Sequence, residues 1–113
     1  MRNPVWREDE IVLALDLFHE LPSSHISAAN PKIQALSDQL RALSPVNALN
    51  ATYRNPNGVA LKLHNLARFD STRTARGMSR GGKLEEKVWA RFNGKRTFLR
   101  EEAARIREHA KQG

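Results

Sequence analysis

Five segments with apolar residues at helical spacing constrain this chain most strongly, because each needs a common core to cover one face. They span residues 7–21, 31–43, 56–67, 84–92 and 97–111. No segment alternates apolar and polar residues long enough to predict a strand. A length of 113 residues suits one modest core. We therefore expect an all-α fold, with residues 1–113 forming a single compact domain of about five helices and long basic loops.

Two of these segments begin with an Asn-Pro pair, at Asn30-Pro31 and Asn55-Pro56. Asn can cap a helix, and Pro suits the first helical position, where no N–H group is needed. At the second start, Arg54 adds a charge beside a helix end whose dipole favours anions. We expect three backbone N–H groups to lie there without partners, those of Asn57, Gly58 and Val59. The identical start at residue 30 shows that the motif alone does not establish a binding site.

The net charge of +7 is distributed unevenly along the chain. Residues 1–50 carry 4 basic and 6 acidic side chains, whereas residues 51–113 carry 15 basic and 6 acidic ones. An excess confined to one half predicts a basic face, and the usual partner of a basic face is nucleic acid. An anionic membrane is the lesser alternative, because no basic segment also has a wide aromatic or Leu-rich face.

Residues 70–83 have no apolar periodicity but are rich in Gly, Arg and hydroxyl side chains. Glycine permits close approach of a backbone to a ligand, and Arg, Lys and Ser contact phosphates in protein–DNA complexes. A solvated linker is the alternative interpretation, but the arginines and the scarcity of acids favour function. The candidate contacts in this loop are Arg73, Arg76, Ser79, Arg80, Gly81, Gly82 and Lys83.

Several function classes are disfavoured by what the chain lacks. There is no cysteine, and the four histidines are scattered without metal-ligand spacing. Without paired carboxylates near the basic loop or an HNH motif, we expect no catalytic residues, no metal site and no cofactor. No apolar run reaches about 18 residues, and no signal peptide is evident. A cytoplasmic, intracellular protein is therefore expected.

Three stretches together resemble a known family. They are Asn3-Pro4-x-Trp6 followed by Arg7-Glu-Asp-Glu, then Tyr53-Arg54-Asn55-Pro56-Asn57-Gly58-Val59 with Lys62, then Ser79-Arg80-Gly81-Gly82-Lys83 with Val88-Trp89. They resemble the sulfur-binding domain of McrA-like type IV restriction enzymes, which usually precedes an HNH nuclease domain. Trp6 and Arg7 are adjacent here, so the opening motif is shorter than in the family.

The resemblance implies binding to double-stranded DNA whose backbone carries a phosphorothioate, with sulfur in place of one non-bridging oxygen. It places the sulfur in a shallow apolar pocket at Pro56, with Asn55, Gly58 and Val59 as neighbours. It places Arg80 and Lys83 in a loop over the DNA. Further expected DNA contacts are Arg7, Tyr53, Lys62, Arg73 and Arg76. A nuclease domain is an expected partner, and the chain itself is expected to be a binding module and not an enzyme.

Three other functions remain open at this point. The first is a helical DNA- or RNA-binding domain that reads only charge and shape. The second is a nuclease, which the missing metal ligands disfavour. The third is a protein-interaction module that uses the last helix, although the narrow apolar stripe of that helix suffices only for the core.

Overall fold

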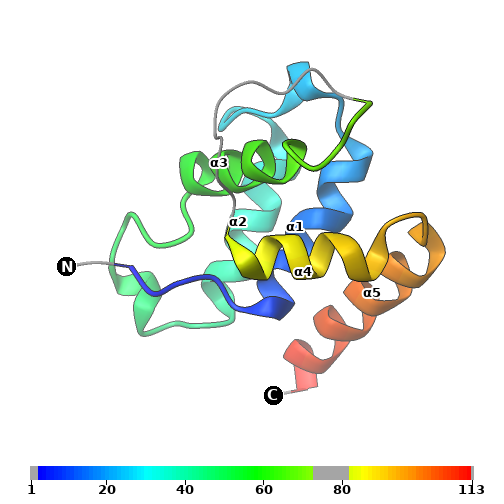
Figure 1. Ribbon diagram of the computed structural model, residues 1–113. Coiled ribbons are helices and arrows are strands. Elements are labelled where there is room, and N and C mark those ends of the chain that lie inside the picture. Colours follow the sequence, from blue (N-terminus) through cyan, green and yellow to red (C-terminus); the bar gives the residue numbers. More distant parts are fainter. Residues whose placement is uncertain (1–2, 73–81, 113) are drawn as a thin grey trace.

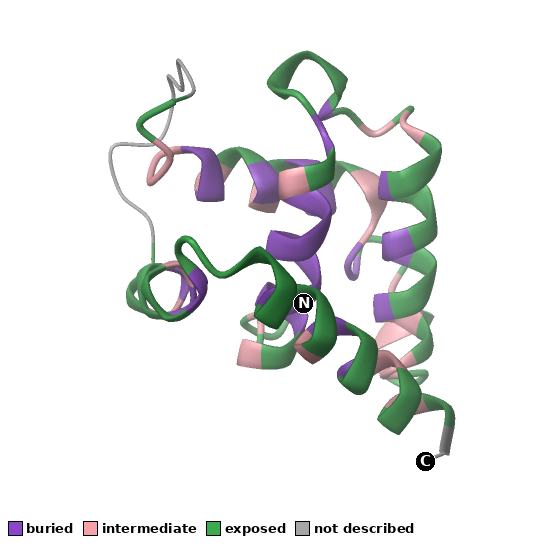
Figure 2. Cartoon of the chain, turned by 90° about the vertical axis from the view of Figure 1, so that its right-hand side faces the viewer, coloured by how far each residue is buried: buried purple, intermediate pink, exposed green. Residues whose placement is uncertain are grey.

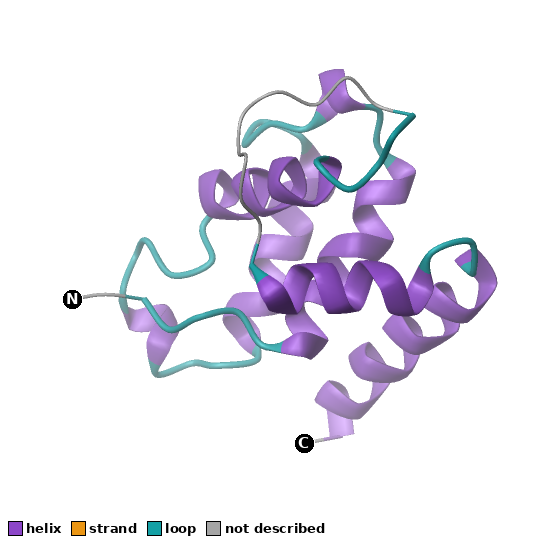
Figure 3. Cartoon of the chain, in the orientation of Figure 1, coloured by secondary structure: helices purple, strands orange, loops and turns teal. Residues whose placement is uncertain are grey.

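The computed structural model describes residues 3–72 and 82–112, and within them the chain is all-helical (Figures 1 and 3). The predicted fold class is confirmed. The helices are α1 (Glu8–Glu20), α2 (Pro31–Ala42), α3 (Pro56–Ala67), α4 (Lys83–Phe92) and α5 (Arg96–Gln112), with 3₁₀ turns at Ser23–His25 and Asn47–Leu49.

The first helix, α1, forms the centre of the fold and contacts each of the other four helices (Figure 2). The sequence predicts one apolar stripe along it, yet the nine residues from Glu10 to Phe18 are all buried. Val12, Leu13 and Leu17 lie off the expected stripe and are also covered. A helix that is apolar around its whole circumference is stable only when neighbours surround it.

The other helices each contribute a stripe to this core, as their spacing predicts. Burial of aliphatic and aromatic side chains is the main favourable term in folding, at roughly 25 cal/mol per Å² of apolar surface removed from water. The buried side chains that share this core with α1 include Ile33, Leu36 and Leu40 of α2, Val59, Leu63 and Leu66 of α3, Val88 and Phe92 of α4, and Leu99, Ala103 and Ile106 of α5.

Each helix boundary lies within one residue of the predicted one. The sequence predicts a helix from residue 97, but α5 begins at Arg96. The Leu99 N–H group bonds the Lys95 carbonyl at 2.9 Å, which places the start one residue earlier. Gly94, with φ of +74°, makes the tight turn after α4.

The N-terminal segment, residues 3–7, lies along the connection between α2 and α3. The Asn3 side chain donates to the Thr52 hydroxyl at 3.2 Å and accepts from the Asn50 amide at 2.9 Å. These contacts join segments about fifty positions apart. The N-terminal segment, the connection and the start of α3 therefore lie on one side of the molecule (Figure 1).

Candidate nucleic-acid interface

The start of α3 is a capped helix terminus that is less open than the sequence predicts. The Asn55 Oδ1 atom accepts the Gly58 N–H group at 2.8 Å, and the Asn55 carbonyl accepts the Val59 N–H group at 2.9 Å. Two of the three N–H groups expected to be free are therefore occupied, and that part of the prediction is wrong. The N–H group of Asn57 has no hydrogen bond to any described residue, and its side chain is exposed.

Gly58 allows Asn55 to cap α3 in this way. A Cβ atom on Gly58 would lie 3.1 Å from Asn55 Oδ1, which is closer than ordinary van der Waals contact. At the otherwise similar start of α2, the side chain of Asn30 accepts from Lys32 instead, at 2.8 Å. The two Asn-Pro starts therefore have different cap geometries. Pro31 and Pro56 both occupy the first position of a helix, but the residues around them differ.

Pro56 lies at the edge of an open hollow of about 320 Å³, called here the Pro56 hollow. Side chains of α2 form one wall, and the end of the α2–α3 connection forms the other. Its lining residues are Gln34, Ser37, Asp38, Arg41, Ala51, Asn55 and Pro56. The apolar part of this lining is the Pro56 ring with Ala51, and Asp38 adds a carboxylate to the lining.

Val59 does not take part in this hollow. It is completely buried and packs in the main core with α1. The expectation that Val59 forms an apolar wall for a ligand is therefore wrong. The reason is helical geometry, because position 59 falls on the face of α3 that carries Leu63 and Leu66, which are buried against the same core.

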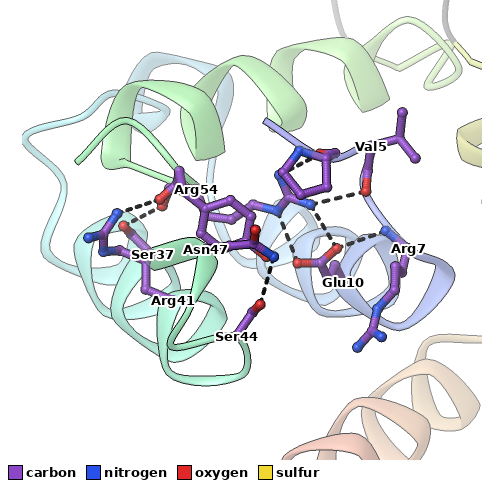
Figure 4. A network of polar contacts seen from close by, with 10 residues as sticks. Val5, Arg7, Glu10, Ser37, Arg41, Ser44, Asn47 and Arg54 are labelled. Atoms are coloured by element: carbon purple, nitrogen blue, oxygen red, sulfur yellow. Dashed lines mark hydrogen bonds and ion pairs between the residues drawn. The ribbon is translucent and has the colours of Figure 1, made fainter. Parts of the chain in front are cut away.

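Arg54 is buried, with only 5% of its surface exposed, and it does not face solvent beside the helix end. Its Nε and Nη2 atoms bond the two carboxylate oxygens of Glu10 at 3.0 and 3.1 Å. Nη1 and Nη2 also donate to the carbonyls of Pro4 and Val5, at 3.0 and 3.1 Å (Figure 4). The predicted phosphate contact at Arg54 is therefore wrong, because its charge and four of its donors are already used within the fold.

Two aromatic rings lie close to the guanidinium of this buried ion pair. The Arg54 guanidinium carbon lies 4.4 Å from the centre of the Tyr53 ring and 4.8 Å from that of Trp6. Tyr53 is itself buried, so it is not available as the DNA contact that the resemblance suggested. Arg54 has φ of +47°, a conformation that non-Gly residues rarely adopt. The Ser37 hydroxyl donates to the Arg54 carbonyl at 2.6 Å and holds this peptide in place.

Arg41 is a second organising arginine, and the sequence places it only on the outer face of α2. Its Nη2 atom donates to the Ala48 carbonyl at 2.6 Å, and Nη1 donates to the Tyr53 carbonyl at 2.6 Å. Nη1 also contacts the carbonyls of Asn50 and Ala51, at 3.3 and 3.4 Å. The guanidinium thus binds the backbone of the α2–α3 connection through its carbonyls. Apolar periodicity in the sequence does not predict hydrogen bonds of a side chain to backbone carbonyls.

Lys62 links α3 to the start of α4. Its ammonium lies 3.1 Å from the carboxylate of Glu85 and 5.1 Å from the centre of the Trp6 ring. Its side chain is only 15% exposed, so most of its charge serves this contact. Gly82 lies beside the same carboxylate, because a Cβ there would come within 2.0 Å of a Glu85 oxygen. The space beside Gly82 is therefore occupied by the Glu85 carboxylate.

The predicted site residues separate into four groups. Arg7, Asn57, Gly82 and Lys83 are exposed, and Asn55, Pro56, Gly58 and Lys62 are half-buried. Tyr53, Arg54 and Val59 are buried. The remaining candidates lie outside the described residues, namely Arg73, Arg76, Ser79, Arg80 and Gly81.

Trp6 joins the N-terminal and central motif segments and lies near the start of α4. Its ring lies over Arg54 on one side and near the Lys62 ammonium, which in turn meets Glu85 of α4. The N-terminal motif, the central motif and the first turn of α4 are thereby brought together. A cation–π contact such as that between Arg54 and the Trp6 ring is worth about 0.5–2 kcal/mol, depending on burial.

Comparisons with known proteins add no relative. The chain matches no protein-family model, no curated protein and no solved structure. Within residues 3–72 and 82–112, no group of three or more His, Asp or Glu side chains is placed to hold a metal ion. No helix among the same residues has the length and apolar character needed to cross a bilayer.

Proposed function

We propose that this chain binds DNA that carries a backbone phosphorothioate, with the sulfur in the Pro56 hollow. The observation that carries the proposal is the position of Pro56, whose ring borders an open hollow at the dipole-positive start of a capped helix. The buried Arg54–Glu10 pair fixes the backbone just before it. A hollow formed by such constrained residues is pre-organised, which lowers the entropic cost of binding.

The chemistry favours sulfur over oxygen at this position. A non-bridging oxygen placed against the Pro56 ring and Ala51 loses hydrogen bonds to water, at a cost of about 1–3 kcal/mol. Sulfur is larger, softer and weakly hydrated, so it loses less and gains dispersion contacts. The expected preference is roughly 10- to 200-fold. The Asp38 carboxylate repels either anion, so it does not contribute to the preference for sulfur.

Contacts to neighbouring phosphates would supply the affinity that does not depend on sulfur. Arg7 and Lys83 are exposed and available for this purpose, whereas Arg54 and Lys62 are engaged by carboxylates. Phosphate contacts release counterions, so this part of the binding weakens with salt. The candidate basic residues between 73 and 80 would add to it.

The decisive experiment compares one duplex with and without a single phosphorothioate at a fixed salt concentration. We expect tighter binding of the modified duplex, and of only one of its two sulfur diastereomers, because one non-bridging position faces the hollow. Equal affinity for modified and unmodified duplexes would contradict the proposal. It would favour the alternative of a helical nucleic-acid-binding domain that reads charge and shape alone.

Pro56 and Pro31 offer a matched pair of variants. Pro56→Ala is expected to lose most of the sulfur preference while keeping weak, salt-sensitive binding. Pro31→Ala removes the same ring from the same helical position of α2 and should leave the preference unchanged. Equal effects of the two substitutions would assign Pro56 a purely structural role.

A further inference from the structure

An uncharged loop projects beside the Pro56 hollow. No charged residue occurs between Arg41 and Arg54, although 27% of the chain is charged. Residues 43–53 are called here the neutral loop. Its tip carries two aliphatic side chains that are almost fully exposed, Val46 at 79% and Leu49 at 87%. Aliphatic side chains that stay in water add nothing to the stability of the fold, because they bury no apolar surface.

The neutral loop is held in a defined shape. Arg41 binds its backbone through four carbonyls, from Ala48 to Tyr53, as described above. The Asn47 amide donates to the Ser44 hydroxyl at 2.8 Å, and Asn50 is tied to the N-terminal segment. The exposed aliphatic tip is therefore presented by an ordered loop, which is the arrangement expected of a pre-organised contact surface.

The neutral loop borders the same surface as Pro56. Ala51 of the loop lines the Pro56 hollow. Asn47 lines a second depression of about 110 Å³ together with Val5, which is 86% exposed. The loop and the start of α3 lie on the same side of the molecule (Figure 1). A duplex with one phosphate at Pro56 would therefore extend past the loop.

The size and chemistry of the tip decide what it would contact. Specific protein–protein interfaces bury about 1,200 Å² or more, and two aliphatic side chains on a loop supply only a small part of this. Phosphates would be met by charged or hydroxyl groups, which the tip lacks. The apolar group that a DNA duplex offers in its major groove is the thymine methyl, and aliphatic side chains contact it there.

We propose that Val46 and Leu49 contact thymine methyl groups in the major groove beside the modified linkage. The contact gives the domain a base preference that the phosphorothioate alone cannot give. This inference rests on the proposed function, because it places the modified phosphate in the Pro56 hollow. Arg41 acts as a positioning residue for the contact.

The test uses modified duplexes in which each flanking thymine is replaced in turn by deoxyuridine, which removes only the methyl group. Burial of one methyl is expected to be worth about fourfold in affinity. The wild-type protein should lose this factor at one or two positions. The double variant Val46→Ser with Leu49→Ser should bind more weakly and show no such loss at any position. Its salt dependence and its sulfur preference should match those of the wild type.

Leu61→Ser is the matched control, because Leu61 is an exposed aliphatic residue of α3, at 53%. It should leave the deoxyuridine scan unchanged, and thermal unfolding should show that all variants are folded. A wild-type scan without any methyl effect would overturn the inference, as would a double variant that keeps the wild-type pattern. Absence of a sulfur preference in the wild type would instead overturn the proposed function, so the two failures are distinguishable.

Discussion

Arg54 shows how one residue changes role between sequence and structure. Its position before Asn55-Pro56 suggests a phosphate contact, but its partners are the Glu10 carboxylate, two carbonyls and two aromatic rings. Glu10 in turn accepts the Arg7 N–H group at 2.8 Å at the start of α1. One buried ion pair thus connects the beginnings of α1 and α3, and through them the whole candidate interface.

Arg54→Ala is therefore expected to destabilise the fold strongly, by about 3–5 kcal/mol, because it leaves the Glu10 carboxylate buried and unpaired. Urea unfolding followed by circular dichroism measures this difference. Arg100→Ala is the control, because Arg100 pairs with Glu20 at 3.0 Å on the surface. Surface pairs contribute up to about 1 kcal/mol. A similar loss for both variants would contradict the assigned role of Arg54.

Asn55 and Asn30 provide a second prediction on single residues. Each side chain caps its helix with a hydrogen bond of 2.8 Å, so replacement by Ala should cost about 1 kcal/mol at either position. Binding of modified DNA should weaken only for Asn55→Ala, because only Asn55 lines the Pro56 hollow. Stability comes from urea titration and affinity from fluorescence anisotropy. Equal binding by both variants would remove Asn55 from the interface.

Among the elements, the α2–α3 connection shows an order that no regular secondary structure explains. Arg41 holds it through backbone carbonyls, and the Asn50 and Tyr53 N–H groups make turn hydrogen bonds of 3.0 Å. The length of the connection alone suggests a loose loop. Its order comes from side-chain contacts, of Arg41 with four carbonyls and of Asn3 with Asn50 and Thr52. Its shape therefore depends on tertiary structure.

Arg41→Ala should loosen this connection and leave the core intact. Hydrogen exchange measured by NMR is expected to become faster at the amides of Asn50 and Tyr53, while the amides of α1 keep their protection. Lys32→Ala is the control on α2, because the Lys32 side chain pairs with Glu20 on the surface, at 3.7 Å. Unchanged exchange in Arg41→Ala would show that other contacts maintain the connection.

For the whole molecule, the packing of α5 on α1 includes a titratable group. Asp16 of α1 is buried, and its carboxylate lies 3.6 Å from Arg107 of α5. Burial raises the pKa of Asp16 above its ordinary value of 3.8, and Arg107 opposes this rise. The folded state therefore holds this proton more tightly than the unfolded state. The contribution of Asp16 to stability is largest below pH 3.8 and declines as pH rises through the folded pKa.

Asp16→Asn should consequently flatten the dependence of stability on pH just above that value. At neutral pH the variant should be as stable as the wild type or slightly more stable, because a buried charge is removed. Thermal unfolding over roughly pH 3–7 checks this expectation. A clear loss of stability at neutral pH would mean that the attraction to Arg107 outweighs the cost of burial.

Much of this architecture could be predicted from local pattern. The bounds of α3 agree with the prediction, and the stripes of α2, α4 and α5 lie in the core as their spacing indicates. Both Asn-Pro starts cap their helices as expected. These features depend on residues within four positions of one another, where helical geometry is decided by the local backbone.

The amino-acid sequence by itself therefore determined the all-α fold, the helix bounds and the capped start of α3. Only the tertiary structure decided which residues near Pro56 remain accessible. In the folded chain Arg54 is buried against Glu10, which lies 44 positions away, and Val59 is buried in the core. Charge and spacing along a chain do not show such partners. Whether an arginine faces solvent or a carboxylate depends on which distant segments fold beside it.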